Sequence, residues 1–149
     1  MKFTDVTIGA DPEFFIKKDG EFHPIVGLLG GNKWEPIQVE GMGMYNAYLE
    51  DNVMAEYNIS PVDSAEGFER QIRTMIDLIM EKLGDDFTAD FSPAARFKAS
   101  DLESEQAKVF GCEPDLNAYT LQIQEVSASD AGNLRTAGGH IHIGWAEAM

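Results

Sequence analysis

Apolar and polar residues alternate along several short stretches of the chain, which is the period of a β-strand. This pattern predicts strands from Val6 to Ile16, from Glu21 to Val26 and from Tyr48 to Ile59. Asp19-Gly20 joins the first two and is a strong signal for a two-residue hairpin turn, so these strands are expected to pair in an antiparallel manner. Pro61 is expected to end the third strand.

The stretch after the third strand has the three- and four-residue spacing of an amphipathic helix. Asp63 or Ser64 is suited to cap its N-terminus, and Glu66 lies in its first turn. The helix is expected to end near Leu83, because Gly84 follows. Its apolar residues form one stripe, which we expect to pack on the sheet as core: Phe68, Ile72, Met75, Ile76, Ile79 and Leu83.

The second half of the chain has weaker patterns. A strand from Phe87 to Phe97 is expected to be interrupted at Ser92-Pro93-Ala94, because proline cannot donate a ladder hydrogen bond. A shorter helix is predicted from Asp101 to Phe110 and another strand from Tyr119 to Val126. A polar turn around Ser129 to Asn133 then leads into a last strand.

Length and composition indicate one globular domain over residues 1–149. Hydrophobic residues make up 44% of the chain and aromatic residues 10%, which is enough to build one core. Together with the patterns along the chain, this predicts an α+β fold. We expect an antiparallel β-sheet with one long and one short helix packed on one face.

The chain is strongly acidic, with a formal net charge of −15 and a pI near 4.3. Its lysines and arginines are scattered, so neither nucleic acid nor an anionic membrane is an expected partner. Cys112 is the single cysteine and has no partner for an intramolecular disulfide. No histidine neighbours Cys112 in the sequence, which favours a half-buried thiol over a nucleophile. The N-terminus lacks the apolar core of a signal peptide, so we predict a cytoplasmic protein.

Two histidines lie two positions apart in the segment from Ala137 to Gly144. On a strand, His140 and His142 would share one face, and Ile141 and Ile143 would share the other. The imidazoles would then line a site for a metal or a phosphate, while the isoleucines pack against the core. One buried histidine beside one exposed histidine is the alternative interpretation.

A pair of carboxylates near the N-terminus has the same spacing. Asp11 and Glu13 would share one strand face, and Pro12, Phe14 and Ile16 would share the other. Like charges roughly 5 to 7 Å apart repel unless a cation lies beside them, and a hard divalent cation suits carboxylates. Two solvated acids on an edge strand are the alternative, since Pro12 predicts an edge or a local bulge.

The strand from Tyr48 to Ile59 offers a third polar face, which carries Asn52, Met54, Glu56 and Asn58. One antiparallel sheet would gather the three polar faces into a floor of carboxylates and imidazoles, with the helices behind it. Mixed oxygen and nitrogen ligands suit Mg²⁺ or Mn²⁺ better than structural zinc, for which the chain lacks cysteine pairs. The opposite face would carry Val53, Ala55, Tyr57 and Ile59.

Four motifs follow one another along the chain: Gly9 to Phe15, Asp51-Asn52-Val53 through Glu56, Phe110-Gly111-Cys112 with Pro114-Asp115, and Ala137 to Gly144. Together they resemble the phage-encoded carboxylate-amine ligase family, which is related to glutamine synthetase and glutamate-cysteine ligase. The resemblance covers nearly the whole chain. It implies part of a glutamine synthetase-like catalytic domain. It also implies an enzyme that activates a carboxylate with ATP and joins it to an amine through an acyl phosphate, in the host cytoplasm.

The resemblance also implies ligands for two divalent cations, Mg²⁺ or Mn²⁺, with ATP as co-substrate. Asp11 and Glu13 would each bind a different cation, and Glu56 and His140 would be further ligands. His142 would approach the phosphates of the nucleotide. These assignments give the two histidines different roles.

Further site residues follow from the same resemblance. Arg135 would contact a phosphate or a carboxylate, and a solvated surface arginine is the alternative. The substrate would approach the backbone at Gly138-Gly139 and the side chain of Asn58. No residue stands out as the base that deprotonates the amine. Glu50 and Asp51 are weak candidates for that role.

Enzymes of the glutamine synthetase type continue beyond the histidine strand with more strands, a last metal carboxylate and arginines, whereas this sequence stops at Met149. We therefore expect either the N-terminal part of a longer enzyme or a shortened protein that keeps the cation-binding face without a complete ATP site. A non-catalytic binding or assembly module with the same fold, forming a homo-oligomer or a partner complex, is the main alternative. A metal-dependent hydrolase that uses the same acids and histidines is another.

Overall fold

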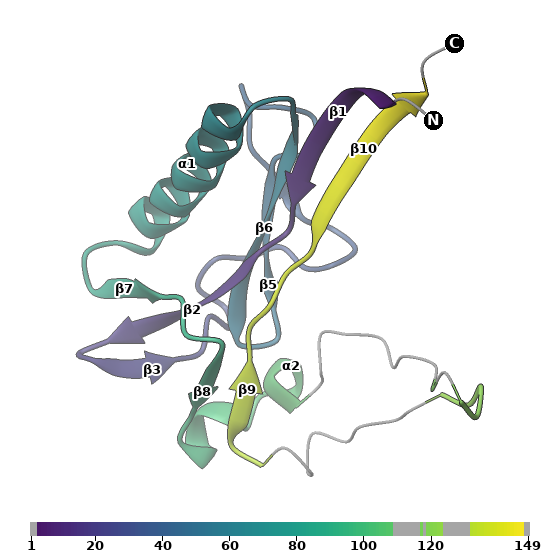
Figure 1. Cartoon of the computed structure of the whole chain (residues 1–149). Helices are drawn as coiled ribbons and strands as arrows, with labels where there is room; N and C mark the ends of the chain where they lie inside the picture. Colours follow the sequence, from purple (N-terminus) through teal and green to yellow (C-terminus); the bar gives the residue numbers. More distant parts are fainter. Residues whose placement is uncertain (1–2, 109–116, 118, 124–131, 148–149) are drawn as a thin grey trace.

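The computed structural model describes residues 3–108, 117, 119–123 and 132–147 (Figure 1). It is a mixed α/β fold dominated by an antiparallel sheet with two helices, which confirms the predicted class. Eight strands of the described residues form the main sheet. They are β1 (Phe3–Ala10), β2 (Glu13–Lys18), β3 (Glu21–His23), β4 (Ile37–Gln38), β5 (Ala47–Asp51), β6 (Met54–Val62), β7 (Phe87–Asp90) and β10 (Ile141–Glu147).

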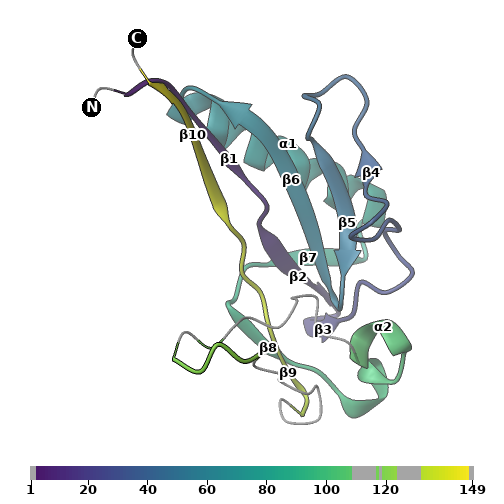
Figure 2. The same cartoon turned by 90° about the vertical axis from the view of Figure 1, so that its right-hand side faces the viewer.

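Strand β6 is the centre of the sheet (Figure 2). β1 and β2 follow one another along one of its edges, through the pairs Ala10 with Ile59 and Glu13 with Glu56. β5 lies along the other edge, and β10 pairs with the outer side of β1. The hairpin predicted at Asp19-Gly20 is confirmed, because it joins β2 to β3.

The predicted strand from Val6 to Ile16 is two strands, because the chain breaks at Asp11 and Pro12. Pro12 has no N–H, and its carbonyl instead accepts a hydrogen bond from the N–H of Tyr57 at 3.2 Å. The N–H of Asp11 turns to the carbonyl of His140 at 3.2 Å. The proline therefore marks the local irregularity expected there, but not a sheet edge, because β1 lies between β10 and β6 and β2 also has partners on both sides.

The predicted strand from Tyr48 to Ile59 was wrong, because this stretch is a β-hairpin of β5 and β6. The turn contains Asn52 with φ of 54°, a conformation that asparagine tolerates better than most residues. Pro61 does not end the strand either, since β6 continues to Val62. It lies in a register shift between β1 and β6, where a missing N–H is tolerated.

Helix α1 (Ala65–Leu83) confirms the predicted long helix. The hydroxyl of Ser64 caps it by accepting a hydrogen bond from the N–H of Gly67 at 3.3 Å, and Gly84 follows its last turn. α1 covers one face of the sheet, as Figure 2 shows. The main core lies between them and includes Phe14, Ile16, Ala55, Tyr57, Ile59, Met75 and Ile79.

A second apolar cluster lies on the opposite face of the sheet. Successive strand residues point to opposite faces, so Phe14 and Ile16 contact α1 while Phe15 joins this second cluster. The short helix was predicted to share the face of α1, and that placement was wrong. The second cluster is covered by β8 (Ala94–Arg96), the 3₁₀ helix η1 (Ala99–Leu102) and α2 (Glu105–Lys108), and β9 (Leu134–Thr136) pairs with β8.

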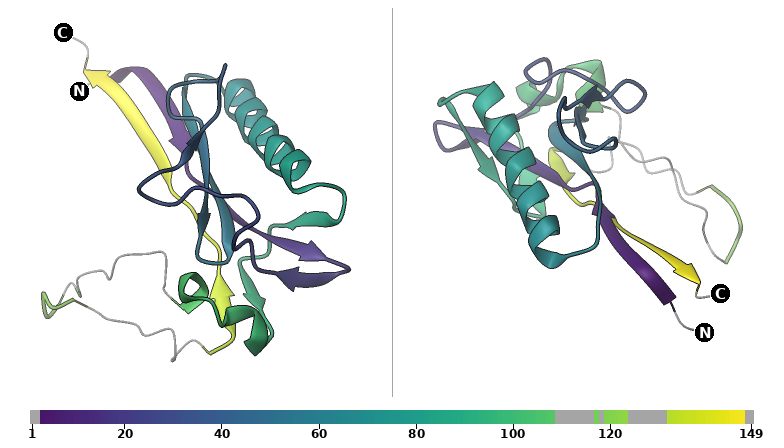
Figure 3. Two further views of the ribbon diagram at one scale, coloured as in Figure 1. Left: turned by 180° about the vertical axis from the view of Figure 1, so that it is seen from behind. Right: turned by 90° about the horizontal axis from the view of Figure 1, so that it is seen from above.

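The isoleucine face of β10 is exposed, although it was predicted to be packed. Ile141 pairs with Ala10 and Ile143 with Ile8, so these residues extend the face that α1 covers. Their exposed fractions are nevertheless 68% and 58%. The reason is that α1 packs on β6 and β7 and does not extend over the β1–β10 ribbon, as the view from above shows (Figure 3).

Some predictions concern residues that the structure describes only in part. The predicted strand from Tyr119 to Val126 begins as a turn, with the N–H of Leu121 bonded to the carbonyl of Asn117. Its end, most of the turn at Ser129 to Asn133, and the motif from Phe110 to Asp115 with Cys112 lie outside the described residues. Within the described part of the chain, no helix is long and apolar enough to cross a membrane.

Two isoleucine substitutions distinguish the packed part of the apolar face from its exposed extension. Ile79 is fully buried, so Ile79→Ala is expected to lower the free energy of unfolding by about 2 to 5 kcal/mol. Ile143→Ala is expected to change it by only about 0.5 kcal/mol or less, because this side chain is more than half exposed. Urea denaturation measures both changes, and equal losses would contradict the described packing.

Candidate functional site

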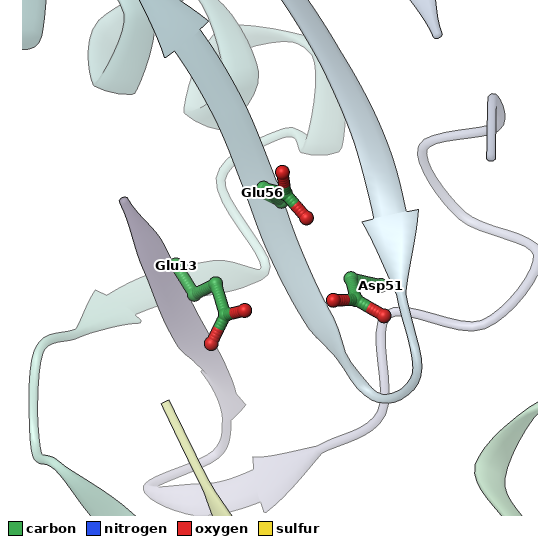
Figure 4. A group of neighbouring side chains, drawn as sticks. All are labelled: Glu13, Asp51 and Glu56. Carbon is green, nitrogen blue, oxygen red and sulfur yellow. The ribbon is translucent and has the colours of Figure 1, made fainter. Parts of the chain in front are cut away.

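Three carboxylates meet on the sheet face opposite α1 (Figure 4). Glu13 of β2 and Glu56 of β6 are direct cross-strand partners, and Asp51 projects from the end of β5 toward them. One oxygen from each lies within 4.8 Å of the other two. We call Glu13, Asp51 and Glu56 the acidic cluster, and each of its side chains is half-buried.

The acidic cluster is electrostatically strained. Loss of hydration, followed by the charges of Asp51 and Glu13, raises the pKa of Glu56 to about 7. Burial also raises the pKa of Glu13 and of Asp51. The charge of Lys33 opposes these shifts at Asp51 and Glu56. Carboxylates held together in this way are stabilised by a proton or by a cation.

Asp11 lies beside the acidic cluster and contacts both histidines of the predicted pair. Its carboxylate is 3.2 Å from Nδ1 of His140 and 3.3 Å from Nε2 of His142, so the two imidazoles lie on one side of the strand. Both imidazoles are exposed, with 79% and 66% of their side-chain surface accessible. The alternative of one buried and one exposed histidine therefore does not hold.

A close backbone crossing brings the histidines to the acids. Gly138 and Glu13 exchange two hydrogen bonds, from the N–H of Glu13 to the carbonyl of Gly138 at 2.9 Å, and from the N–H of Gly138 to Oε2 of Glu13 at 2.7 Å. Gly139 has a φ of 148°, and a Cβ there would lie 2.7 Å from Cα of Pro12. Gly139 therefore allows this crossing, and the predicted contact of both glycines with substrate stays a prediction.

Two of the residues named from the sequence make structural contacts within the fold. Arg135 is 4% exposed, and its guanidinium donates to the carbonyls of Gly132, Leu134 and Ala107 at 2.8 to 2.9 Å. The bond to Ala107 holds β9 to α2, and the predicted contact of Arg135 with a phosphate or a carboxylate stays a prediction. The alternative of a solvated surface arginine does not hold, because the side chain is buried. Glu50 is also buried, and its carboxylate accepts hydrogen bonds from the loop before β4 and from Gln106.

Glu50 is therefore unsuited to be the base that deprotonates an amine. Burial disfavours its charge, but the N–H groups of Gly30, Gly27 and Leu29 and the amide of Gln106 outweigh that effect and lower its pKa. Asn58 lies two positions from Glu56 on β6 and is half-buried, which places it on the polar face. Its contact with substrate stays a prediction.

Asp51 is the site residue that the sequence understated. It was considered only as a weak base, because the stretch around it was interpreted as one continuous strand. The signal that marks it is the Asp51-Asn52 pair, since these residue types favour tight turns. A hairpin at that point places Asp51 beside Glu56, as the structure shows.

The donor atoms of this face suit two kinds of cation site. The acidic cluster offers only carboxylate oxygens, which suit hard divalent cations such as Mg²⁺ and Mn²⁺. Asp11 with His140 offers oxygen and nitrogen together, which Mn²⁺ and other transition metals accept. The residues present therefore fit the cations that the sequence implies.

No family model, curated protein or solved structure matches the chain.

The glycine pair offers a test of the crossing. Gly139→Ala is expected to lower the free energy of unfolding by about 1 to 3 kcal/mol, because its Cβ would meet the backbone of Pro12. Gly138→Ala is the matched control, since nothing lies within 4 Å of a Cβ there, and it is expected to change stability by about 0.5 kcal/mol or less. Thermal unfolding compares them, and an equal effect would contradict the crossing.

The repulsion in the acidic cluster predicts a pH dependence in the absence of divalent cations. The folded protein keeps a proton on Glu56 up to about pH 7, whereas the unfolded chain releases it near pH 4.5. Stability therefore falls as the pH rises between these values. We expect Glu56→Gln to be more stable than the wild type at pH 8 by about 1 to 2 kcal/mol, a figure reduced for solvent screening.

Urea denaturation in EDTA at pH 4 and pH 8 measures this difference. The gap between Glu56→Gln and the wild type should be larger at pH 8 than at pH 4. Asp77→Asn is the control, because Asp77 is an exposed acid of α1, and its effect should be small at both values. A gap that does not grow with pH would contradict the strained cluster.

Proposed function

We propose that this chain is the cation-binding part of an ATP-dependent carboxylate-amine ligase that uses Mg²⁺ or Mn²⁺. The observation that carries the proposal is the acidic cluster beside Asp11 and the two histidines. Two adjacent donor sets on one sheet face are the arrangement that a pair of cations requires. The four sequence motifs that resemble the ligase family support the same function.

The two donor sets would hold one cation each. Glu13, Asp51 and Glu56 would bind the first through oxygen atoms alone, and Asp11 with His140 would bind the second. The cations would neutralise the charge that otherwise keeps an attacking carboxylate away from the γ-phosphate of ATP. This role explains why the chain tolerates three half-buried acids in contact.

The remaining residues of the face would act on the substrates. His142 is exposed and 3.3 Å from Asp11, so its imidazole can bind phosphate oxygens next to the second donor set. Lys33 brings a positive charge near Asp51 and Glu56. Both groups are suited to bind an anionic substrate at the edge of the cation site.

The reaction proposed for the site has two steps. An oxygen of the carboxylate attacks the γ-phosphorus, and the bond to ADP breaks to give an acyl phosphate. The amine nitrogen then attacks the acyl carbon, phosphate leaves with the bonding electrons, and the amine loses a proton. A ligase of this kind releases one ADP and one phosphate for each amide bond.

A non-catalytic binding or assembly module is the second candidate. The exposed Ile141, Ile143 and Trp145 on β10 favour it, because apolar residues on a strand at the edge of a sheet are typical of contact surfaces. This function predicts a defined oligomer or partner complex without nucleotide binding. Sedimentation and nucleotide titration together distinguish it from the ligase.

Calorimetric titration with Mn²⁺, and then with ATP, tests the ligase proposal. The wild type is expected to bind Mn²⁺, and to bind ATP only when Mn²⁺ is present. Glu13→Gln removes one ligand and is expected to weaken Mn²⁺ binding about tenfold or more, which is about 1.4 kcal/mol. Asp77→Asn removes an equal charge on the other face and should change the affinity less than about twofold.

The other outcomes are equally informative. Absence of Mn²⁺ binding, or equal effects of Glu13→Gln and Asp77→Asn, would overturn the proposed site. Mn²⁺ binding without ATP binding would support the assembly module instead. Phosphate release from ATP that does not depend on an amine would favour a metal-dependent hydrolase.

A further inference from the structure

Gln106 on α2 bridges the two residues that flank Asp51. Its single amide nitrogen, Nε2, donates to Oε2 of Glu50 at 3.1 Å and to the backbone carbonyl of Asn52 at 2.9 Å. Nδ2 of Asn52 returns a hydrogen bond to the backbone carbonyl of Gln106 at 3.3 Å. One helix is therefore tied to the side chain of the residue before Asp51 and to the backbone of the residue after it.

The groups that Gln106 holds are themselves fixed. The carboxylate of Glu50 also accepts hydrogen bonds from the N–H groups of Gly27, Leu29 and Gly30, at 2.8 to 2.9 Å. On the other side, α2 is anchored through Ala107, which is fully buried and accepts a hydrogen bond from Arg135 at 2.8 Å. Gln106 thus joins two rigid parts of the fold at the position of Asp51.

We infer that Gln106 is a positioning residue that fixes Asp51 in the geometry required for a small divalent cation. Asp51 ends β5 and precedes a turn whose next residue has a positive φ, so the sheet alone holds it on one side only. The bonds from Gln106 supply the second support. This inference rests on the proposed cation site and adds a selectivity to it.

The selectivity follows from the coordination chemistry of the two common divalent cations. Mg²⁺ demands nearly ideal octahedral geometry at short distances, whereas Ca²⁺ accepts flexible and irregular coordination. A loosened Asp51 therefore costs Mg²⁺ binding more than Ca²⁺ binding. The residues that support metal ligands typically change the affinity about 10- to 100-fold when they are removed.

The test compares Gln106→Met with Gln71→Met. Gln71 is the matched control, because it is also a half-buried glutamine on a helix. Its side-chain amide donates a hydrogen bond to the carbonyl of Ser60 on β6 and accepts one from Asn46, but it lies on the sheet face that α1 covers. Calorimetric titrations of the whole chain with Mg²⁺ and with Ca²⁺ give the affinities, and urea denaturation gives the stability. Both variants keep the length of the side chain and lose the amide hydrogen bonds.

Gln106→Met is expected to weaken Mg²⁺ binding about tenfold and Ca²⁺ binding about threefold or less, so the preference for Mg²⁺ falls. Gln71→Met should change both affinities less than about twofold, even if it costs as much stability. Unchanged Mg²⁺ affinity in Gln106→Met, or equal changes in the two variants, would overturn the inference. A wild type that binds neither cation would overturn the proposed site, and the inference with it.

Gln106→Glu gives a second variant if the methionine variant does not fold. Its carboxylate replaces the amide donor by an acceptor opposite Glu50 and the carbonyl of Asn52, so the bridge is lost without loss of volume. Its added charge acts on both cations, whereas the ratio of the Mg²⁺ and Ca²⁺ affinities reports the geometry. The ratio is expected to fall here as well, and an unchanged ratio would overturn the inference.

Discussion

The crossing of Gly138–His140 over Asp11–Glu13 is the constraint on which the site depends. The N–H groups of Asp11 and Glu13 donate to the carbonyls of His140 and Gly138, and the N–H groups of Gly138 and His140 donate back to the carboxylates of Glu13 and Asp11. These bonds join segments that are more than 120 residues apart in the sequence. On one side of the crossing, β10 continues along β1, and on the other, β9 leads to the second apolar cluster. The same contact therefore joins the main sheet to the smaller layer and brings the histidines to the carboxylates.

The two faces of the sheet have opposite energetic roles. The face under α1 is apolar and supplies most of the burial that stabilises the fold, while the other face concentrates half-buried acids that repel one another. Such repulsion is characteristic of sites selected for binding rather than for stability. The second apolar cluster lies next to these acids and holds their strands in place, because α2 contacts the hairpin turn of β5 and β6 there.

Much of the local structure could be predicted from the sequence, because the signals are local. Ser64, Gly84 and the apolar stripe define α1, and strict alternation assigns Glu13 and Glu56 to one face. The tertiary partners were not predictable in this way. A buried Arg135 and a buried Glu50 have the residue types of binding groups, and only their contacts show that they hold loops and α2 in place. The position of Asp51 depended on a turn at Asn52 that alternation alone conceals.

Strand β10 and the residue before it link the proposed cation site to the exposed apolar face, because alternate residues of one short segment lie on each. Ordering of His140 and His142 also orders Ile141 and Ile143, since they share a backbone. A ligand that binds the histidine face restricts the motion of β10. A partner that then binds the isoleucine face loses less conformational entropy of this strand. By thermodynamic linkage the effect is reciprocal, so occupancy of the two faces is expected to be positively cooperative.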